Sequence, residues 1–89
     1  MVATRRVTLT PTAQRQLAAL DAPTRRRVAH RIEALATAPR PAGAELLRGG
    51  QGELRIRIGD WRVIYVVHDV ELLVLVIKIG HRRDIYRAR

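Results

Sequence analysis

The stretch that decides the fold is ELRIRIGDWR, residues Glu53–Arg62. Apolar and basic side chains alternate along it until a Gly-Asp pair interrupts the pattern. Such alternation indicates a half-buried strand, and a two-residue connection that begins with glycine indicates a β-hairpin with a type II′ turn. The hairpin predicts three opposed pairs: Ile58 with Trp61, Ile56 with Val63, and Arg57 with Arg62.

This register also sorts the side chains between the two faces of the sheet, because successive residues of a strand point to opposite sides. One face carries Arg55, Arg57 and Arg62. The other face carries the apolar side chains Leu54, Ile56, Ile58, Trp61 and Val63. Like charges directly opposite each other destabilise a strand pair, so we expect an anion between Arg57 and Arg62. In the alternative interpretation, the arginines only keep the edge of the sheet soluble.

A second hairpin is predicted at HDVE, His68–Glu71, before the apolar run LLVLVIKI of residues 72–79. A two-residue loop there predicts three further pairs: His68 with Glu71, Ile64 with Leu75, and Arg62 with Ile77. The same register brings residues 80–83 next to the Gly59-Asp60 turn. The side chains predicted to gather at that end of the sheet are His81, Arg82, Arg83 and Tyr86.

Two helices are predicted between an N-terminal strand, Arg6–Thr10, and the hairpins. Thr10 is a good N-cap and Pro11 suits the first position of a helix through residue 20. A second helix is predicted from Pro23 to Thr37, followed by a Pro- and Gly-rich loop, residues 39–50, with one turn near residue 45. The predicted fold is therefore α+β, in the order β-α-α-β-β-β. We expect an antiparallel sheet with two helices packed on one face, in a single domain that spans residues 1–89.

Charge is the strongest signal in the composition. Seventeen Lys and Arg residues against eight Asp and Glu residues give a net charge of +9, which predicts a polyanionic partner. A GC-rich genome explains arginine in place of lysine, but it does not explain the scarcity of acids. The longest apolar run, Leu72–Ile77, is far shorter than the roughly 20 residues that span a bilayer, and no signal peptide opens the chain. We therefore expect a cytoplasmic protein without a membrane partner.

Two segments, LRIRIGDWRVIY (54–65) and VIKIGHRRDIYR (76–87), resemble the RelE family within the RelE/ParE superfamily of bacterial toxins. LTPTAQRQLAAL (9–20), IEALATAPRP (32–41) and GAELLRG (43–49) extend the resemblance over nearly the whole chain. It implies a RelE-like fold and a RelB-like antitoxin that wraps the toxin. It also implies a ribosome-dependent endoribonuclease that cleaves messenger RNA in the decoding site. No metal or other cofactor is implied, and the chain has no clustered set of metal ligands.

The resemblance also implies roles for individual residues. Arg62 matches a phosphate-contacting arginine, Arg82 matches an arginine that follows the last strand, and Tyr86 matches a tyrosine that stacks on a base. The basic strand positions of the family fall on Arg55 and Arg57. The implied reaction is attack by the 2′-hydroxyl on the adjacent phosphate, which leaves a cyclic phosphate and a free 5′-hydroxyl. Guanidinium groups suit the charge that develops on the phosphate.

Proton transfer is where the chain departs from the family pattern. Some members carry lysine at the positions of Arg55 and Arg57, but arginine stays protonated in proteins and does not act as a general base. His81 is the first candidate for an acid or base, because imidazole titrates near neutrality. Glu45 is the second, because related ribonuclease toxins use a glutamate in the equivalent loop. Their structural alternatives are that His81 caps the last strand and that Glu45 pairs with Arg48.

Three further basic residues are predicted to bind RNA: Arg27 and Arg31 on the second helix and Arg83 in the tail. A solvated helix surface is the alternative, as packing on the sheet is for Tyr86. Two other functions stay open. One is a ParE-type toxin that inhibits DNA gyrase by protein–protein contact, and the other is a degenerate module that binds antitoxin without cleaving RNA. The paired basic strand positions and the C-terminal tyrosine favour the RelE-type nuclease.

Overall fold

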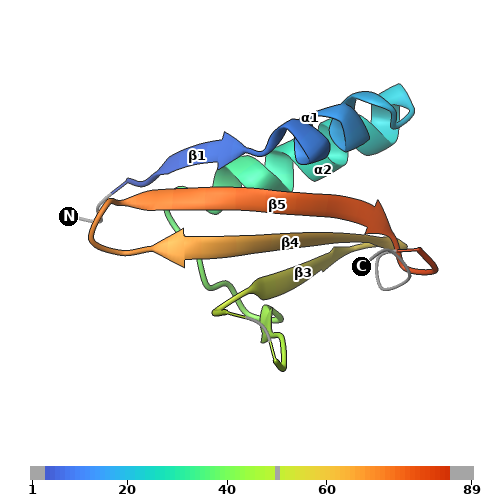
Figure 1. The fold of residues 1–89 in the computed structure, drawn as a ribbon. Coiled ribbons are helices and arrows are strands. Elements are labelled where there is room, and N and C mark those ends of the chain that lie inside the picture. The colour runs from blue at the N-terminus through green and yellow to red at the C-terminus, as the bar shows by residue number, and fades with distance from the viewer. Residues whose placement is uncertain (1–3, 50, 85–89) are drawn as a thin grey trace.

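A five-stranded sheet carries two helices on one face in the computed structural model of the protein, which describes residues 4–49 and 51–84 (Figure 1). The order of the strands across the sheet is β1-β5-β4-β3-β2. The elements along the chain are β1 (Arg6–Leu9), α1 (Pro11–Ala18), α2 (Ala22–Ala34), β2 (Glu45–Leu46), β3 (Leu54–Ile58), β4 (Trp61–His68) and β5 (Leu73–His81). The predicted α+β class and the two helices on one face are confirmed.

The β3–β4 hairpin has the register that its sequence predicts. The observed pairs are Ile58 with Trp61, Arg57 with Arg62, and Ile56 with Val63. Gly59 takes a φ of +61°, as the first central residue of a type II′ turn requires. The apolar side chains of the hairpin therefore face the helices, and its arginines lie on the open face of the sheet.

The sheet is mixed: the predicted antiparallel pairing is confirmed for β3 to β5, and β1 is the exception. β1 pairs with β5 in parallel, from Arg6 opposite Leu73 to Leu9 opposite Val76. A parallel pair needs a long crossover, which here runs through both helices and the β3–β4 hairpin. The segment near Glu45, predicted to be a turn, is also different: β2 adds to the edge of the sheet, with Glu45 opposite Arg55 and Leu46 opposite Leu54.

The second hairpin corrects another part of the predicted register. The β4–β5 loop has four residues, 69–72, so that His68 pairs with Leu73, and the non-glycine Leu72 has a φ of +53°. An irregularity between Ile64 and Tyr65 shifts the pairing once more, which puts Arg62 opposite Gly80. The expected position of residues 80–83 is nevertheless confirmed, since the Arg82 N–H donates to the Asp60 carbonyl at 2.7 Å.

The helices begin where the sequence predicts and end a few residues earlier. The Thr10 hydroxyl accepts from the Ala13 N–H at 3.1 Å, and the Asp21 carboxylate caps α2 through the Thr24 N–H at 3.3 Å. Both helices lay their apolar sides on the sheet, and the core contains Ala13, Val28, Ile32 and Leu35 from the helical segment and Ile56, Val63, Tyr65, Val74, Val76 and Ile79 from the strands. No helix within the described residues is long and apolar enough to cross a membrane.

Candidate nucleic-acid interface

Three strands bring four arginines to one end of the sheet, and we call Arg55, Arg57, Arg62 and Arg82 the arginine cluster. Arg57 and Arg62 are directly opposed across β3 and β4. The Arg62 guanidinium folds back on the turn, where its Nη1 donates to the carbonyls of Gly59 at 3.0 Å and Trp61 at 3.1 Å. Arg82 follows β5 and is tied to the same turn by an Nε–Oδ1 contact of 3.7 Å with Asp60. The convergence that the sequence predicts therefore exists for these four residues.

The environment of Arg62 reflects the crowding of positive charge. Partial burial lowers the pKa of its guanidinium, and the neighbouring charges of Arg57, Arg55 and Arg82 lower it further. Each of these effects disfavours the charged form in the absence of an anion. An anionic group placed among these side chains would reverse the repulsion. The electrostatics of Arg62 thus support an anion-binding role for this end of the sheet.

An internal anion already lies at the edge of the cluster. The Glu45 carboxylate accepts a hydrogen bond from Nη2 of Arg55, and its Oε1 lies 3.9 Å from Nη2 of Arg57. The hydrogen bond to Arg55 is the main reason that the pKa of Glu45 is lowered, followed by the charges of Arg55, Arg57 and Arg62. The structure thus pairs Glu45 with Arg55, while the alternative pairing predicted from the sequence was with Arg48. A lowered pKa also makes this carboxylate a weaker base.

His81 lies on the other face of the sheet. It is paired with Trp61 across β4 and β5, and directly opposed residues share a face. The two rings meet edge to face with their centroids 5.5 Å apart, and Nδ1 of His81 accepts from the Arg83 N–H at 3.2 Å. The structure therefore separates this predicted acid or base from the open-face arginines, in an arrangement closer to the structural alternative.

The predicted RNA-binding residues outside the strands are placed less uniformly. Arg27 of α2 reaches the hairpin turn, because a Cβ built on Gly59 would lie 3.0 Å from its Nη2. Arg31 is exposed one helical turn further along, and Arg83 is exposed after β5. Tyr86, predicted to stack on a base, lies outside the described residues.

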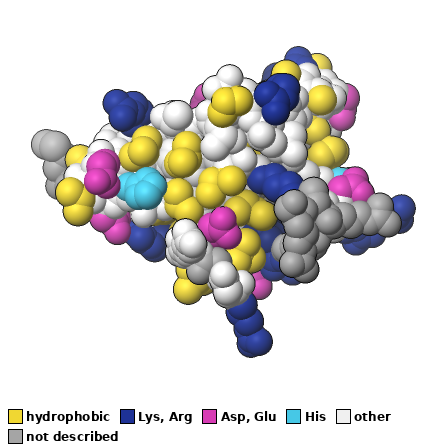
Figure 2. Space-filling view, viewed as in Figure 1, with side chains coloured by type: hydrophobic (Ala, Val, Ile, Leu, Met, Phe, Trp, Pro, Cys, Tyr) yellow, Lys and Arg dark blue, Asp and Glu magenta, His cyan; other side chains and the backbone are white. Residues whose placement is uncertain are grey.

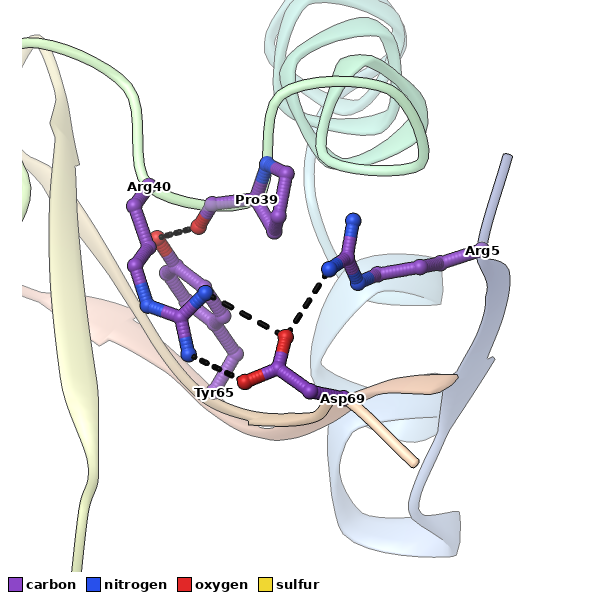
Figure 3. Close-up of polar contacts among 5 residues, drawn as sticks. All are labelled: Arg5, Pro39, Arg40, Tyr65 and Asp69. Carbon is purple, nitrogen blue, oxygen red and sulfur yellow. Dashed lines mark hydrogen bonds and ion pairs between the residues drawn. The ribbon is translucent and has the colours of Figure 1, made fainter. Parts of the chain in front are cut away.

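A second polar cluster, which the sequence did not reveal, holds the loop before β2 (Figure 3). Asp69 in the β4–β5 loop receives hydrogen bonds from Arg5 at 2.8 Å and from Arg40 at 3.0 Å. These two arginines lower the pKa of Asp69, Arg40 more than Arg5. Beside them the hydroxyl of the buried Tyr65 donates to the Pro39 carbonyl at 2.7 Å. The cluster joins three parts of the chain that are distant in sequence, residues 5, 39–40 and 65–69, so no local pattern marks it. Together they anchor the start of the loop that leads to Glu45.

The surface seen in Figure 2 carries both hydrophobic and basic side chains. Hydrophobic side chains gather over the middle of this view, with Lys and Arg side chains around them. Three large hydrophobic side chains are exposed among the described residues: Leu46, Val70 and Leu72. A surface of this composition suits contact with both a polyanion and a protein.

The family model for the ParE toxin of the type II toxin-antitoxin system, parDE, matches residues 7–86. Among solved structures, the toxin–antitoxin complex RelBE2 from Mycobacterium tuberculosis contains a similar chain, with a TM-score of 0.80 and 26% identity over 94% of this chain and 98% of that chain. The archaeal RelE–RelB complex from Pyrococcus horikoshii OT3 contains a chain with a TM-score of 0.79 and 27% identity over 91% of this chain and 98% of that chain. The intact RelBE complex of E. coli contains a chain with a TM-score of 0.76 and 22% identity over 86% of this chain and 95% of that chain, which is a likeness of fold. No curated protein matches the chain.

Proposed function

The chain belongs to the ParE toxin family, within the RelE/ParE superfamily of type II toxin–antitoxin toxins, and we propose that it is a ribosome-dependent endoribonuclease that cleaves messenger RNA. The observation that carries the proposal is the arginine cluster, four guanidinium groups from three segments around one hairpin turn. The ion pairs of this cluster include those with the carboxylates of Glu45 and Asp60. The excess positive charge suits a phosphodiester.

The proposed chemistry uses the messenger as its own nucleophile. The 2′-hydroxyl attacks the adjacent phosphorus, the bond to the 5′-oxygen breaks, and a cyclic phosphate forms. Negative charge rises on the phosphate oxygens during attack, so fixed guanidinium donors stabilise the transition state more than the ground state. Arg62 is best placed for this role, because its Nη1 bonds to the turn carbonyls hold the head group in position.

Few of the described groups near the arginine cluster can take up or release a proton during the reaction. An arginine does not give up its proton near neutral pH, Glu45 is a weakened base, and His81 faces away from the open-face arginines. We therefore propose that orientation and charge stabilisation supply most of the rate, with Tyr86 as the base-stacking residue. Arg27 and Arg31, with Arg83, are proposed to hold RNA phosphates around the site.

The proposed partners are an antitoxin and the translating ribosome. The solved relatives are complexes of RelE with RelB, which supports a RelB-like antitoxin for this chain. A ribosomal substrate places the protein in the cytoplasm.

The test is single-turnover cleavage of a ribosome-bound messenger, read by toeprinting. Arg62→Ala is expected to lower the rate by about 10²–10³, the usual cost of one lost transition-state donor. Arg6→Ala, an exposed arginine on β1 at the far edge of the sheet, is the matched control and is expected to cleave at the wild-type rate. Wild-type cleavage by Arg62→Ala would refute the assignment of the site.

A second candidate function is gyrase inhibition without nuclease activity, and the match to the ParE model favours it. Supercoiling by purified gyrase separates the two. Inhibition of supercoiling together with an intact ribosome-bound messenger would support the ParE-type function. A protein that binds antitoxin and does neither would be the degenerate module.

A further inference from the structure

We propose that Glu45 is a built-in competitor for the RNA phosphate: its carboxylate occupies the arginine cluster in the free protein and must leave when an anionic ligand binds. The inference rests on the proposed function in one respect, that the cluster binds an RNA phosphate. It adds a regulatory contact to that site and gives Glu45 a role other than that of a general base.

Carboxylates and phosphodiesters compete for the same guanidinium groups. A carboxylate and a phosphodiester both present two oxygens to a guanidinium group, so Arg55 and Arg57 can bind either one but not both in the same place. The Arg55 side chain is only 15% exposed, and it binds the Glu45 carboxylate. Arg57 is 63% exposed and its Nη2 lies 3.9 Å from the same carboxylate oxygen. Glu45 thus spans from the shielded arginine toward the exposed one, where a phosphate arriving from solvent would be held.

The position of Glu45 at the sheet edge leaves it able to move. It belongs to β2, a strand of two residues that, within the described part of the chain, pairs with Leu54 and Arg55 of β3. The Glu45 side chain is 51% exposed, and the neighbouring Leu46 is 69% exposed. A short edge strand with exposed side chains gives up little packing when it shifts. The loop before it is fixed instead at its start, through Tyr65 and Arg40.

The balance of charge also favours replacement of Glu45 by a phosphate. Arg57 and Arg62 stand opposite each other, with the Glu45 carboxylate beside Arg57. Glu45 relieves part of this repulsion in the free protein, and it lies nearer to Arg55 than to Arg57. A phosphate between Arg57 and Arg62 would relieve the repulsion more fully. The cluster is therefore held ready by a weak internal anion that a stronger one replaces.

The test is binding of a short single-stranded oligonucleotide to the purified toxin, measured by fluorescence anisotropy without ribosomes. Glu45→Gln keeps an amide oxygen that accepts from Arg55 and removes only the charge. We expect this variant to bind roughly threefold to tenfold more tightly, the effect of one unit charge a few ångströms away in water. Glu71→Gln makes the same change of charge in the β4–β5 loop, at the other end of β4, and is expected to stay within about twofold of the wild type.

The salt dependence of binding distinguishes electrostatic competition by Glu45 from a change of structure in the Glu45→Gln variant. The gain from Glu45→Gln is expected to shrink as salt rises from about 0.05 M to about 0.3 M, because screening weakens the competing carboxylate and the ligand alike. Unchanged or weaker binding by Glu45→Gln, while Arg62→Ala still weakens binding, would overturn the competitor role and leave the proposed function intact. If Arg62→Ala also binds like the wild type, the cluster is no RNA site, and both proposals fail.

Discussion

Tyr65→Phe tests how much of the structure around the site depends on one buried hydroxyl. The Tyr65 ring is fully buried in the core, and its hydroxyl donates to the Pro39 carbonyl at 2.7 Å. Phenylalanine keeps the ring and creates no large cavity, so the cost is essentially that of the hydrogen bond. A hydrogen bond of this kind contributes about 1–1.5 kcal/mol to the free energy of unfolding. For a domain of this size, the melting temperature is expected to fall by roughly 4–12 °C.

The pH dependence of the same pair gives an independent check. Burial raises the pKa of Tyr65, and the nearby charge of Arg40 opposes part of that rise. A raised folded-state pKa means that stability is intact below about pH 10, the ordinary value, and is lost as pH rises above it. Tyr65→Phe lacks this titration, so the difference in stability between the two proteins is expected to narrow above pH 10. Other alkaline titrations occur in both proteins and cancel in the comparison.

The assay is a circular-dichroism melt of both proteins at neutral pH and at several values above pH 10. Tyr65→Ala serves as the contrasting variant, because loss of the ring adds a cavity and is expected to cost about 3–5 kcal/mol. A fall in melting temperature of less than about 2 °C for Tyr65→Phe would refute the reasoning, since the hydroxyl would then contribute little.

Three further changes probe the hairpin and the second polar cluster. Arg57→Gln is expected to leave the melting temperature unchanged or slightly higher while weakening RNA binding, because the side chain is exposed and opposes Arg62; a clear loss of stability would show that its contact with Glu45 matters structurally. Gly59→Ala is expected to cost about 1–2 kcal/mol in urea unfolding, because φ is +61° and the new methyl group would meet Arg27 at 3.0 Å; an unchanged midpoint would contradict this geometry. Asp69→Asn is expected to melt at a lower temperature at pH 7 and to lose less stability on acidification than the wild type. The pKa of Asp69 is lowered in the folded protein, so its contribution to stability is present above about pH 4 and is lost as pH falls further. Parallel profiles of melting temperature against pH would argue against the ion pairs with Arg40 and Arg5.

Local patterns determined the parts of this molecule whose physics is local. The Gly59-Asp60 connection admits few hairpin geometries, so one turn sets every pair from Ile58–Trp61 to Ile56–Val63. The same alternation separates the core residues of β3 from its arginines. Helix starts were also predictable, because the caps at Thr10 and Asp21 are short-range hydrogen bonds. The net charge is a sum over residues and does not depend on the fold.

Tertiary structure alone decided the contacts between segments that are distant in the chain. The β4–β5 loop has no glycine to mark its length, and Leu72 takes the positive φ that sequence reasoning assigns to glycine or asparagine. β2 adds two residues at the sheet edge, and this pairing brings Glu45 to Arg55, ten positions later in the chain. The contact depends on how the chain returns to the sheet between β2 and β3. His81 is a second example. The sequence identifies it as a titratable side chain, but the face of the sheet on which it lies is set by an irregularity between Ile64 and Tyr65. A single-residue shift in a strand moves a side chain to the opposite face, so the sequence could predict that His81 lies near the Gly59-Asp60 turn but not on which face of the sheet it lies.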